Sequence, residues 1–342
     1  MKKTPWIVTP SPFILVRNTV DNMNLTTLLC LLPHVMMILI DRDFAALLIA
    51  AVSVTASLLS EVFLSFTVRR KVYDPLAVLL AGLLSGLLLP SVMPPLIAFS
   101  SVFIGMCISR VLFGGNGSYW MHPVAVAIGI AWISRPDVFP GQLVSIEGVR
   151  GVGSFFEALK LDNFAVLPQD AIITSQLNTG FLSHLGIKLP EGYITLFWNS
   201  PSTIPAFRYN VFTLISSIFL IAMRNIDAIV PSVFILTYAA AVRVLSLVPI
   251  TAAFMGGDIL FSLLTGGILF IAFFLAGDYS VNPRTLQAKI VMGIISGATA
   301  FLVCGPGGTP VGGIFTLLAM NSIAPFIEKI ESRRFVDRSK TR

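Results

Sequence analysis

Long apolar stretches separated by short polar breaks recur along most of the chain. A helix needs roughly 17–25 mainly apolar residues to cross a bilayer, and most of these stretches reach that length. The predicted spans are residues 23–40, 44–67, 72–91, 93–113, 121–134, 210–223, 226–248, 257–276, 287–304 and 311–327. The fifth and sixth are short, so they must borrow flanking residues, tilt or be broken. The pattern predicts an all-α polytopic membrane protein with about ten transmembrane helices.

One long segment interrupts this pattern. Residues 135–208 mix proline, glycine, charged and apolar side chains, so they are too polar to cross and too apolar for a plain linker. We expect this segment to pack on the membrane surface, and long ordered loops often carry function. The chain then divides into a first transmembrane half (1–134), this loop region (135–208), and a second transmembrane half with a basic tail (209–342).

The two halves resemble each other in sequence. Residues 79–90 have a counterpart in 263–278, and the Gly-rich segment 114–130 has one in 305–321. Five spans in each half, an odd number, require the second half to be inverted relative to the first. Matching Gly/Pro-interrupted segments in inverted repeats indicate a site near the middle of the membrane, lined by helix ends. The alternative is that glycine and proline are simply common in membrane helices. We predict two inverted five-helix repeats with Gly/Pro-broken segments.

Charge is scarce and unevenly placed. Charged residues make up 12% of the chain, against about 25% in typical soluble domains. If both termini are cytoplasmic, 16 of the 23 lysines and arginines fall on the cytoplasmic side, as the positive-inside rule requires. The basic residues flank apolar runs and form no stripe, which disfavours nucleic-acid binding. We predict a multi-pass protein of the inner (cytoplasmic) membrane with both termini cytoplasmic and residues 135–208 outside.

Glu61 is the carboxylate to consider for an ion path. It lies late in the second predicted span, and ionisable residues inside membranes often serve transport. The alternative is that its side chain extends to the cytoplasmic interface. Asp74, Asp258 and Asp278 stand near span ends and are expected to be interfacial helix-end residues.

Histidines and cysteines predict no metal or disulfide site. His34 and His122 lack a second ligand at metal spacing. Cys30, Cys107 and Cys304 are far apart, lie in or at the end of apolar runs and form no CxxC pair, so they are expected to be small apolar helix residues. The chain also contains no Ser/His/Asp set, Walker loop or Rossmann fingerprint.

Several segments, taken in order, resemble one family. They are residues 11–33, 57–90, 109–130, 256–285 and 317–328. The second of these segments reads SLLSEVFLSFTVRRKVYDPLAVLLAGLLSGLLLP. The chain is similar to the D subunit of the Rnf electron-transport complex, which is related to the B subunit of the sodium-translocating NADH:quinone reductase. The resemblance covers roughly residues 10–330, apart from much of the central loop.

The resemblance implies a membrane subunit of a redox-driven ion pump that is not active alone. Such complexes pass electrons between ferredoxin and NAD and couple this flow to Na⁺ or H⁺ translocation. The implied partners are the other subunits of the complex, the lipid bilayer and a flavin transferase. The implied cofactor is FMN, esterified to a threonine of the extracytoplasmic loop within the pattern Asp-x-x-Ser-x-Ala-Thr.

The chain departs from that pattern. Asp170 is present, but Gln176 stands where the family has its threonine. Thr179 is the closest replacement and Thr174 the second, so both are candidates for covalent FMN. The GETSA-like stretch that the family carries after the loop is replaced by TIPAFRYN at 203–210.

A literal SGAT occurs at residues 296–299, but in the middle of the ninth span. A phosphate there would be buried in apolar surroundings at a high free-energy cost. We expect these small residues to form a close contact between helices instead.

Two other functions fit the same pattern. Inverted five-helix repeats also occur in stand-alone channels and transporters of small polar solutes. A subunit without a cofactor or an ion path could also serve as a scaffold for a complex.

Overall fold

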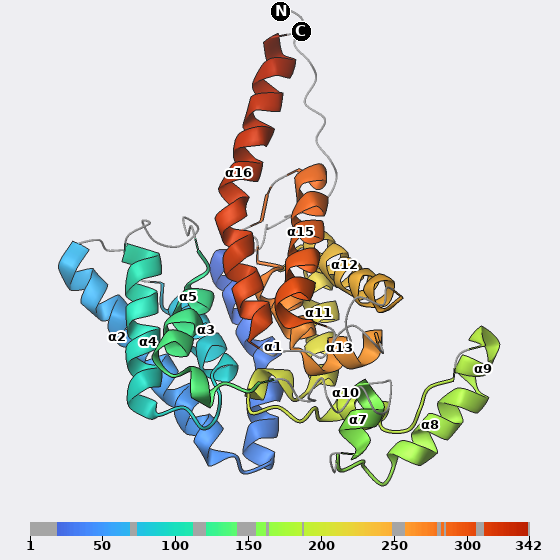
Figure 1. The fold of residues 1–342 in the computed structure, drawn as a ribbon. Helices are drawn as coiled ribbons and strands as arrows, with labels where there is room; N and C mark the ends of the chain where they lie inside the picture. Colours follow the sequence, from blue (N-terminus) through green and yellow to red (C-terminus); the bar gives the residue numbers. More distant parts are fainter. Residues whose placement is uncertain are drawn as a thin grey trace, which may run out of the picture.

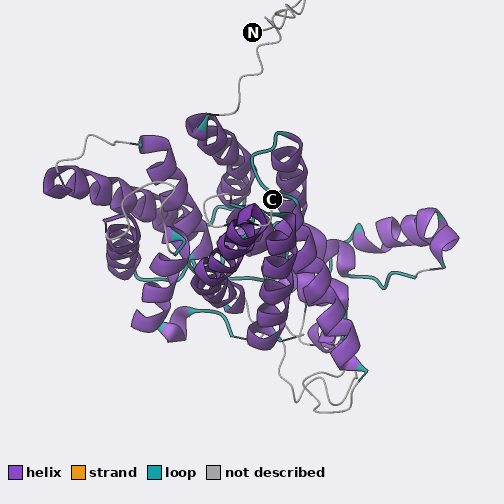
Figure 2. Ribbon diagram, turned by 90° about the horizontal axis from the view of Figure 1, so that it is seen from above, coloured by secondary structure: helices purple, strands orange, loops and turns teal. Residues whose placement is uncertain are grey.

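The computed structural model consists of helices and short connections, and its described part contains no strand (Figure 2). It describes residues 19–68, 74–111, 121–141, 155–161, 164–186, 188–247, 257–278, 282–283, 285–305 and 311–340. The predicted all-α class is confirmed. Much of the predicted Gly-rich correspondence, residues 112–120 and 306–310, lies outside the described residues.

In the described part of the first half, five helices begin where the sequence favours a helix start. Thr19 accepts a hydrogen bond from Asn22 N at the start of the first helix, and Asp74 accepts one from Ala77 N at the start of the third. Proline opens the third, fourth and fifth helices, where its missing N–H has no intrahelical partner to lose. The helices are α1 (Val20–Ile40), α2 (Phe44–Val68), α3 (Pro75–Leu88), α4 (Pro95–Met106), which continues into the π-helical turn η1 (Cys107–Val111), and α5 (Pro123–Ser134).

The second half follows the same order, but its third element is broken. Its continuous helices are α11 (Asn210–Ala222), α12 (Ile229–Ser246), α15 (Leu286–Cys304) and α16 (Gly312–Lys340). The predicted span 257–276 instead forms α13 (Ile259–Thr265), α14 (Ile268–Phe270) and the π-helical turn η5 (Ile271–Leu275). The break falls at Gly267, whose φ is +66°, and a Cβ there would lie 2.5 Å from the ring of Phe207. Only glycine accepts both that backbone conformation and that approach.

Helix length supports repeated passage through lipid. Four described helices are long and apolar enough to cross a membrane, judged by length and composition: Val20–Ile40, Phe44–Thr67, Ile229–Ser246 and Leu286–Cys304. The shorter apolar helices are Pro75–Leu88, Pro95–Arg110, Pro123–Ser134, Asn210–Ala222 and Gly312–Ile327. A membrane protein with several apolar helices is therefore confirmed.

Helices at corresponding places in the two halves have corresponding neighbours (Figure 1). In the first half, α2 packs against α3 and α4, and α4 packs against α5. In the second half, α12 packs against α13 and α15, and α15 packs against α16. The halves meet where α1 contacts α11 and where α5 contacts α16.

The helices α1 and α11 also end in the same way. An arginine with a left-handed backbone follows each C-cap, with φ of 56° at Arg42 and 56° at Arg224. The closing hydrogen bonds run from Asp43 N to Ile38 O at 3.1 Å and from Asn225 N to Leu220 O at 2.8 Å. Both ends are therefore Schellman motifs, which usually carry glycine at the left-handed position.

The loop region is largely helical where it is described. It contains η2 (Pro136–Val138), α7 (Phe155–Leu161), α8 (Asp170–Thr179), α9 (Phe181–Leu185), α10 (Tyr193–Trp198) and η3 (Pro205–Phe207). Helices α7 to α10 lie at one end of the bundle, and α8 with α9 projects to the side (Figure 1). The last part of the region does not remain at the surface, because Ile204, Ala206 and Phe207 are buried.

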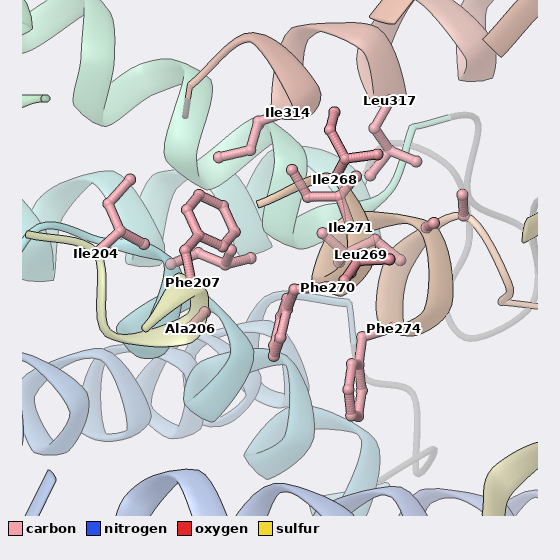
Figure 3. Close-up of a cluster of buried hydrophobic side chains, with 14 of the residues drawn as sticks. Ile204, Ala206, Phe207, Ile268, Leu269, Phe270, Ile271, Phe274, Ile314 and Leu317 are labelled. Atoms are coloured by element: carbon pink, nitrogen blue, oxygen red, sulfur yellow. The ribbon is translucent and has the colours of Figure 1, made fainter. Parts of the chain in front are cut away.

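These buried loop residues join an apolar cluster with side chains of the broken element and α16 (Figure 3). The rings of Phe207 and Phe270 lie 6.3 Å apart, and those of Phe270 and Phe274 stack at 4.6 Å. Ile314 of α16 completes the same cluster. Side chains therefore fill the space next to the broken element.

Small residues bring α12 and α15 together. A Cβ on Gly297 would lie 2.7 Å from Phe234 O and 2.6 Å from Thr237 Cβ, so only a hydrogen fits there. Ser296 beside it is buried and bonds to the carbonyl of Met292 in its own helix. The expected close helix contact is confirmed at Gly297, whereas Ala298 is exposed.

Candidate functional site

The carboxylate of Asp170 organises the described part of the loop. It accepts hydrogen bonds from Gly192 N at 2.7 Å, Thr195 N at 2.7 Å, Thr195 Oγ1 at 2.6 Å and Thr174 Oγ1 at 3.0 Å. Burial opposes the charge, but the bonds from Thr195 and Gly192 outweigh it and hold the pKa of Asp170 below its ordinary value. The ionised side chain thus ties the start of α8 to the start of α10.

Two further features keep this part of the loop in place. Gly192 has φ of +107°, and a Cβ there would lie 2.8 Å from Phe156 Cζ, so glycine is required. Asn178 donates from Nδ2 to Leu189 O at 2.9 Å and accepts from Leu189 N at 2.8 Å. The region is built around polar side chains bonded to backbone, as a segment outside the apolar core requires.

The two flavin candidates lie in different surroundings on α8. Thr174 is buried, and its hydroxyl donates to Asp170. Thr179 is exposed at the last position of the helix, and its hydroxyl donates to Ser175 O at 2.8 Å. Only Thr179 therefore offers a hydroxyl to an enzyme that approaches from solvent.

The surroundings of Thr179 do not suit an FMN phosphate. The C-terminal end of a helix carries the negative end of its dipole, which repels an anion. The last turn of α8 contains no basic side chain, and Nδ1 of His184 is within 2.9 Å of Gly180 O. The last turn of α8 itself thus provides a hydroxyl but no positive side chain for the phosphate.

Glu61 is paired inside the first half. Its Oε2 lies 3.5 Å from Nη1 of Arg110, and both side chains are buried. Glu61 is only 5% exposed, so its carboxylate meets Arg110 and not solvent. Arg110 lies in η1, and a π-helical turn changes the direction in which side chains leave a helix. The countercharge therefore comes from a turn that the apolar pattern did not predict.

A second polar cluster holds the turn between α1 and α2. Arg208 donates to Asp43 at 2.7 Å and to the carbonyl of Ser202 at 2.8 Å. The hydroxyl of Tyr209 donates to Asp41. Residues at the end of the loop region and directly after it thus bind the end of α1 and the turn that follows.

The expected helix-end aspartates make specific contacts. Asp74 and Asp258 cap α3 and α13 through the backbone N–H groups of Ala77 and Phe261. Asp278 lies after η5, with Oδ2 3.5 Å from Nε2 of His122 at the start of α5. This contact joins the two halves, and no local pattern could indicate it because the partners are 156 positions apart.

Comparison with known proteins covers nearly the whole chain. The model of the NQR2, RnfD, RnfE family matches residues 7–336. The chain is 25% identical over 341 residues to the D subunit of the proton-translocating ferredoxin:NAD(+) oxidoreductase complex of Clostridium ljungdahlii, covering 96% of this chain and 95% of that protein. It is 26% identical over 334 residues to the D subunit of the ion-translocating oxidoreductase complex of Methanosarcina acetivorans, covering 95% of each. It is 23% identical over 333 residues to the D subunit of the Na(+)-translocating ferredoxin:NAD(+) oxidoreductase complex of Acetobacterium woodii, covering 96% of this chain and 94% of that protein.

Proposed function

The chain belongs to the NQR2, RnfD, RnfE family, and on that premise we propose that it is a membrane subunit of an ion-translocating ferredoxin:NAD oxidoreductase complex. The observation that carries the proposal is the end-to-end match to relatives named as the D subunits of such complexes. Relatives with proton and with sodium in their names match about equally well. The chain acts with partner subunits and not alone.

We also propose the inverted five-helix repeat. Its support is the matching order of helix neighbours in the two halves and the shared end of α1 and α11. In this repeat, a pseudo-twofold axis relates the two halves. Arg42 then corresponds to Arg224, and the axis passes through the contact between α1 and α11. The broken element α13–α14–η5 then corresponds to α3, so the break belongs to one half only.

The proposed orientation places both termini in the cytoplasm and α7 to α10 outside. It rests on the excess of lysine and arginine on the side of the termini. A cysteine placed at exposed Thr179 tests it, because an impermeant thiol reagent should label that position in sealed cells. Labelling only after permeabilisation would reverse the orientation.

Glu61 remains our candidate for an ion path, now together with Arg110. A cation that approaches Glu61 must displace or neutralise the guanidinium 3.5 Å away. The pair is therefore a site where ion entry can be coupled to a local rearrangement.

We propose that α8 carries no covalent FMN. The buried hydroxyl of Thr174, the helix end at Thr179 and the departure at Gln176 all support this. The chain's place in the complex does not depend on the ester.

A stand-alone channel receives less support. The cluster around Phe207 and Phe270 fills the region next to the broken element with apolar side chains. An open aqueous path there would need polar lining.

Purification of the tagged chain from its own membranes tests the proposed function. We expect other membrane subunits and iron–sulfur subunits to co-purify, and ferredoxin-dependent NAD reduction to be lost on deletion and restored by the gene. Purification of the chain alone, with unchanged NAD reduction in the deletion strain, would overturn the assignment and favour a channel.

A further inference from the structure

Polar contacts follow the line where α1 crosses α11 between the two halves. Going from the α1–α2 turn into the bundle, the contacts are Asp41 with Tyr209, His34 with Thr213, and the carbonyl of Cys30 with Ser216. Eleven residues separate Asp41 from Cys30, which is about 17 Å along a helix. This seam therefore reaches through roughly half of a hydrocarbon core about 30 Å thick.

His34 is the titratable side chain in the middle of this seam. It is fully buried, with 0% exposure, and its Nε2 lies 3.1 Å from Thr213 Oγ1. The hydroxyl of Thr213 donates to Tyr209 O at 3.2 Å, so it accepts from the histidine. Nε2 therefore carries the ring proton, and Nδ1 is an acceptor. Among the described residues, that nitrogen has no hydrogen-bond partner.

Aromatic rings complete the surroundings of His34. Its centroid lies 5.6 Å from that of Phe270 and 6.3 Å from those of Phe212 and Phe274, in edge-to-face arrangements. These three rings enclose a side chain with 0% exposure and bring no charge of their own. Two of the three rings belong to the broken element, so a charge on His34 acts directly on that element.

Charged groups are remote along the helices that surround the ring. Helices α3, α11 and α14 and the turn η5 contain no charged residue, and α1 contains only Asp21, near its start. Helix α2, which also packs against α1, contains Glu61, and this carboxylate is paired with Arg110. The other titratable groups of the seam are Cys30 toward one end, and Asp41 and Tyr209 toward the other. Arg208 and Asp43 pair with each other beside the α1–α2 turn.

We propose that His34 is a proton-binding residue in the interior of the membrane, accepting a proton on Nδ1 while Nε2 keeps its bond to Thr213. The proton comes from the aqueous phase along the polar seam, and the neutral imidazole becomes an imidazolium between the phenylalanine rings. No electron is transferred. This inference goes beyond the proposed membership of a complex, because it concerns the isolated chain and is tested without partner subunits.

Histidine NMR tests the proposal. The chain contains three histidines, so ¹⁵N-histidine labelling of the protein in lipid nanodiscs gives three sets of ring signals. One set should disappear in H34Q, where glutamine can still donate to Thr213 but cannot accept a proton. In the wild type, that set should show the Nε2–H tautomer and should gain a proton on Nδ1 within the pH range where the protein stays folded.

Two further variants make the result decisive. T213V removes the acceptor of Nε2–H and should change the titration midpoint of His34 without abolishing the titration. If H34Q does not fold, the double variant H122N/H184N leaves His34 as the sole histidine, and its titration can be followed directly. A His34 ring that stays neutral while exposed His184 titrates normally would overturn the proposal.

Discussion

Arg42 and Arg224 have the same left-handed backbone conformation, each with φ of 56°, at the ends of α1 and α11. The two helices belong to different halves and meet each other in the bundle. Arginine is strained in this conformation, which glycine adopts without a clash of Cβ with the backbone. The same unfavoured choice at two matching helix ends supports the inverted repeat that we propose.

Glycine at either position should stabilise the protein. We expect R42G and R224G each to raise the free energy of unfolding by about 0.5–1 kcal/mol, because glycine removes the strain at the left-handed position. Thermal unfolding in detergent measures this. The control is R243G, which places glycine in the last turn of α12 at an ordinary helical position and should destabilise by about 1 kcal/mol. A loss of stability in all three variants would contradict the prediction.

The Glu61–Arg110 pair should show strong coupling. E61Q leaves the buried guanidinium without its countercharge, and breaking a buried pair typically costs about 3–5 kcal/mol. We expect R110Q to cost a similar amount, and E61Q/R110Q to cost clearly less than the sum. Denaturation of the four proteins completes the double-mutant cycle, with E157Q on exposed Glu157 as a neutral control.

A measurement of ion movement by the assembled complex distinguishes a role of Glu61 on the ion path from a purely structural role. Loss of ion movement in a stable E61Q/R110Q variant would support a place on the ion path. Retained movement would make the pair purely structural.

Acid should loosen the loop region through Asp170. Its pKa in the folded chain is lowered, so its stabilising contribution is fully present above the unfolded value of about 4 and is lost as the pH falls through the folded value. We expect backbone hydrogen exchange in residues 164–198 to accelerate in that acid range. D170N should accelerate exchange already at neutral pH and remove most of the acid sensitivity.

An exposed carboxylate provides the matched control for Asp170. Asp137 forms a surface pair with Arg135 at 2.7 Å, and D137N should leave exchange in residues 164–198 unchanged. Equal effects of D170N and D137N would show that general charge, and not the hydrogen bonds of Asp170, governs the loop.

The mass of the intact protein decides the flavin question. We expect the chain, expressed with a flavin transferase, to carry no FMN increment, because the helix end at Thr179 repels an anion and Thr174 is buried. A fluorescent band in denaturing gels that is lost in T179A but kept in T174A would contradict this expectation and locate the ester at Thr179.

The α12–α15 contact should not accept a methyl group. We expect G297A to destabilise by about 1–3 kcal/mol, since its Cβ would lie 2.7 Å from the Phe234 carbonyl oxygen. At Gly129 in α5, the nearest atom to a Cβ is Leu318 Cδ1 at 3.4 Å, so G129A should be tolerated. Unfolding of both variants measures the difference, and equal stabilities would argue against close packing at Gly297.

The apolar pattern was sufficient for the helical class, because a stretch of apolar side chains must be buried or face lipid whatever its neighbours are. It located α1 to α5, α11, α12, α15 and α16 closely, but it did not indicate the short helices α7 to α10 of the loop region. It interpreted Gly297 correctly as a helix contact. It did not reveal the break at Gly267, because the cause is the ring of Phe207, which comes from the loop region. Flavin attachment and the ion path remain predictions.

The apolar pattern and the local motifs of this chain determined its class, a helical membrane protein, and, through the resemblance they carry, the family to which it is similar. Only the tertiary structure decided what the polar residues do. Glu61 is paired by a residue 49 positions away, Asp170 by groups 22 and 25 positions away, and His34 by a threonine 179 positions away. A buried polar group is stabilised by the partner it meets, and that partner is set by packing and not by neighbouring sequence.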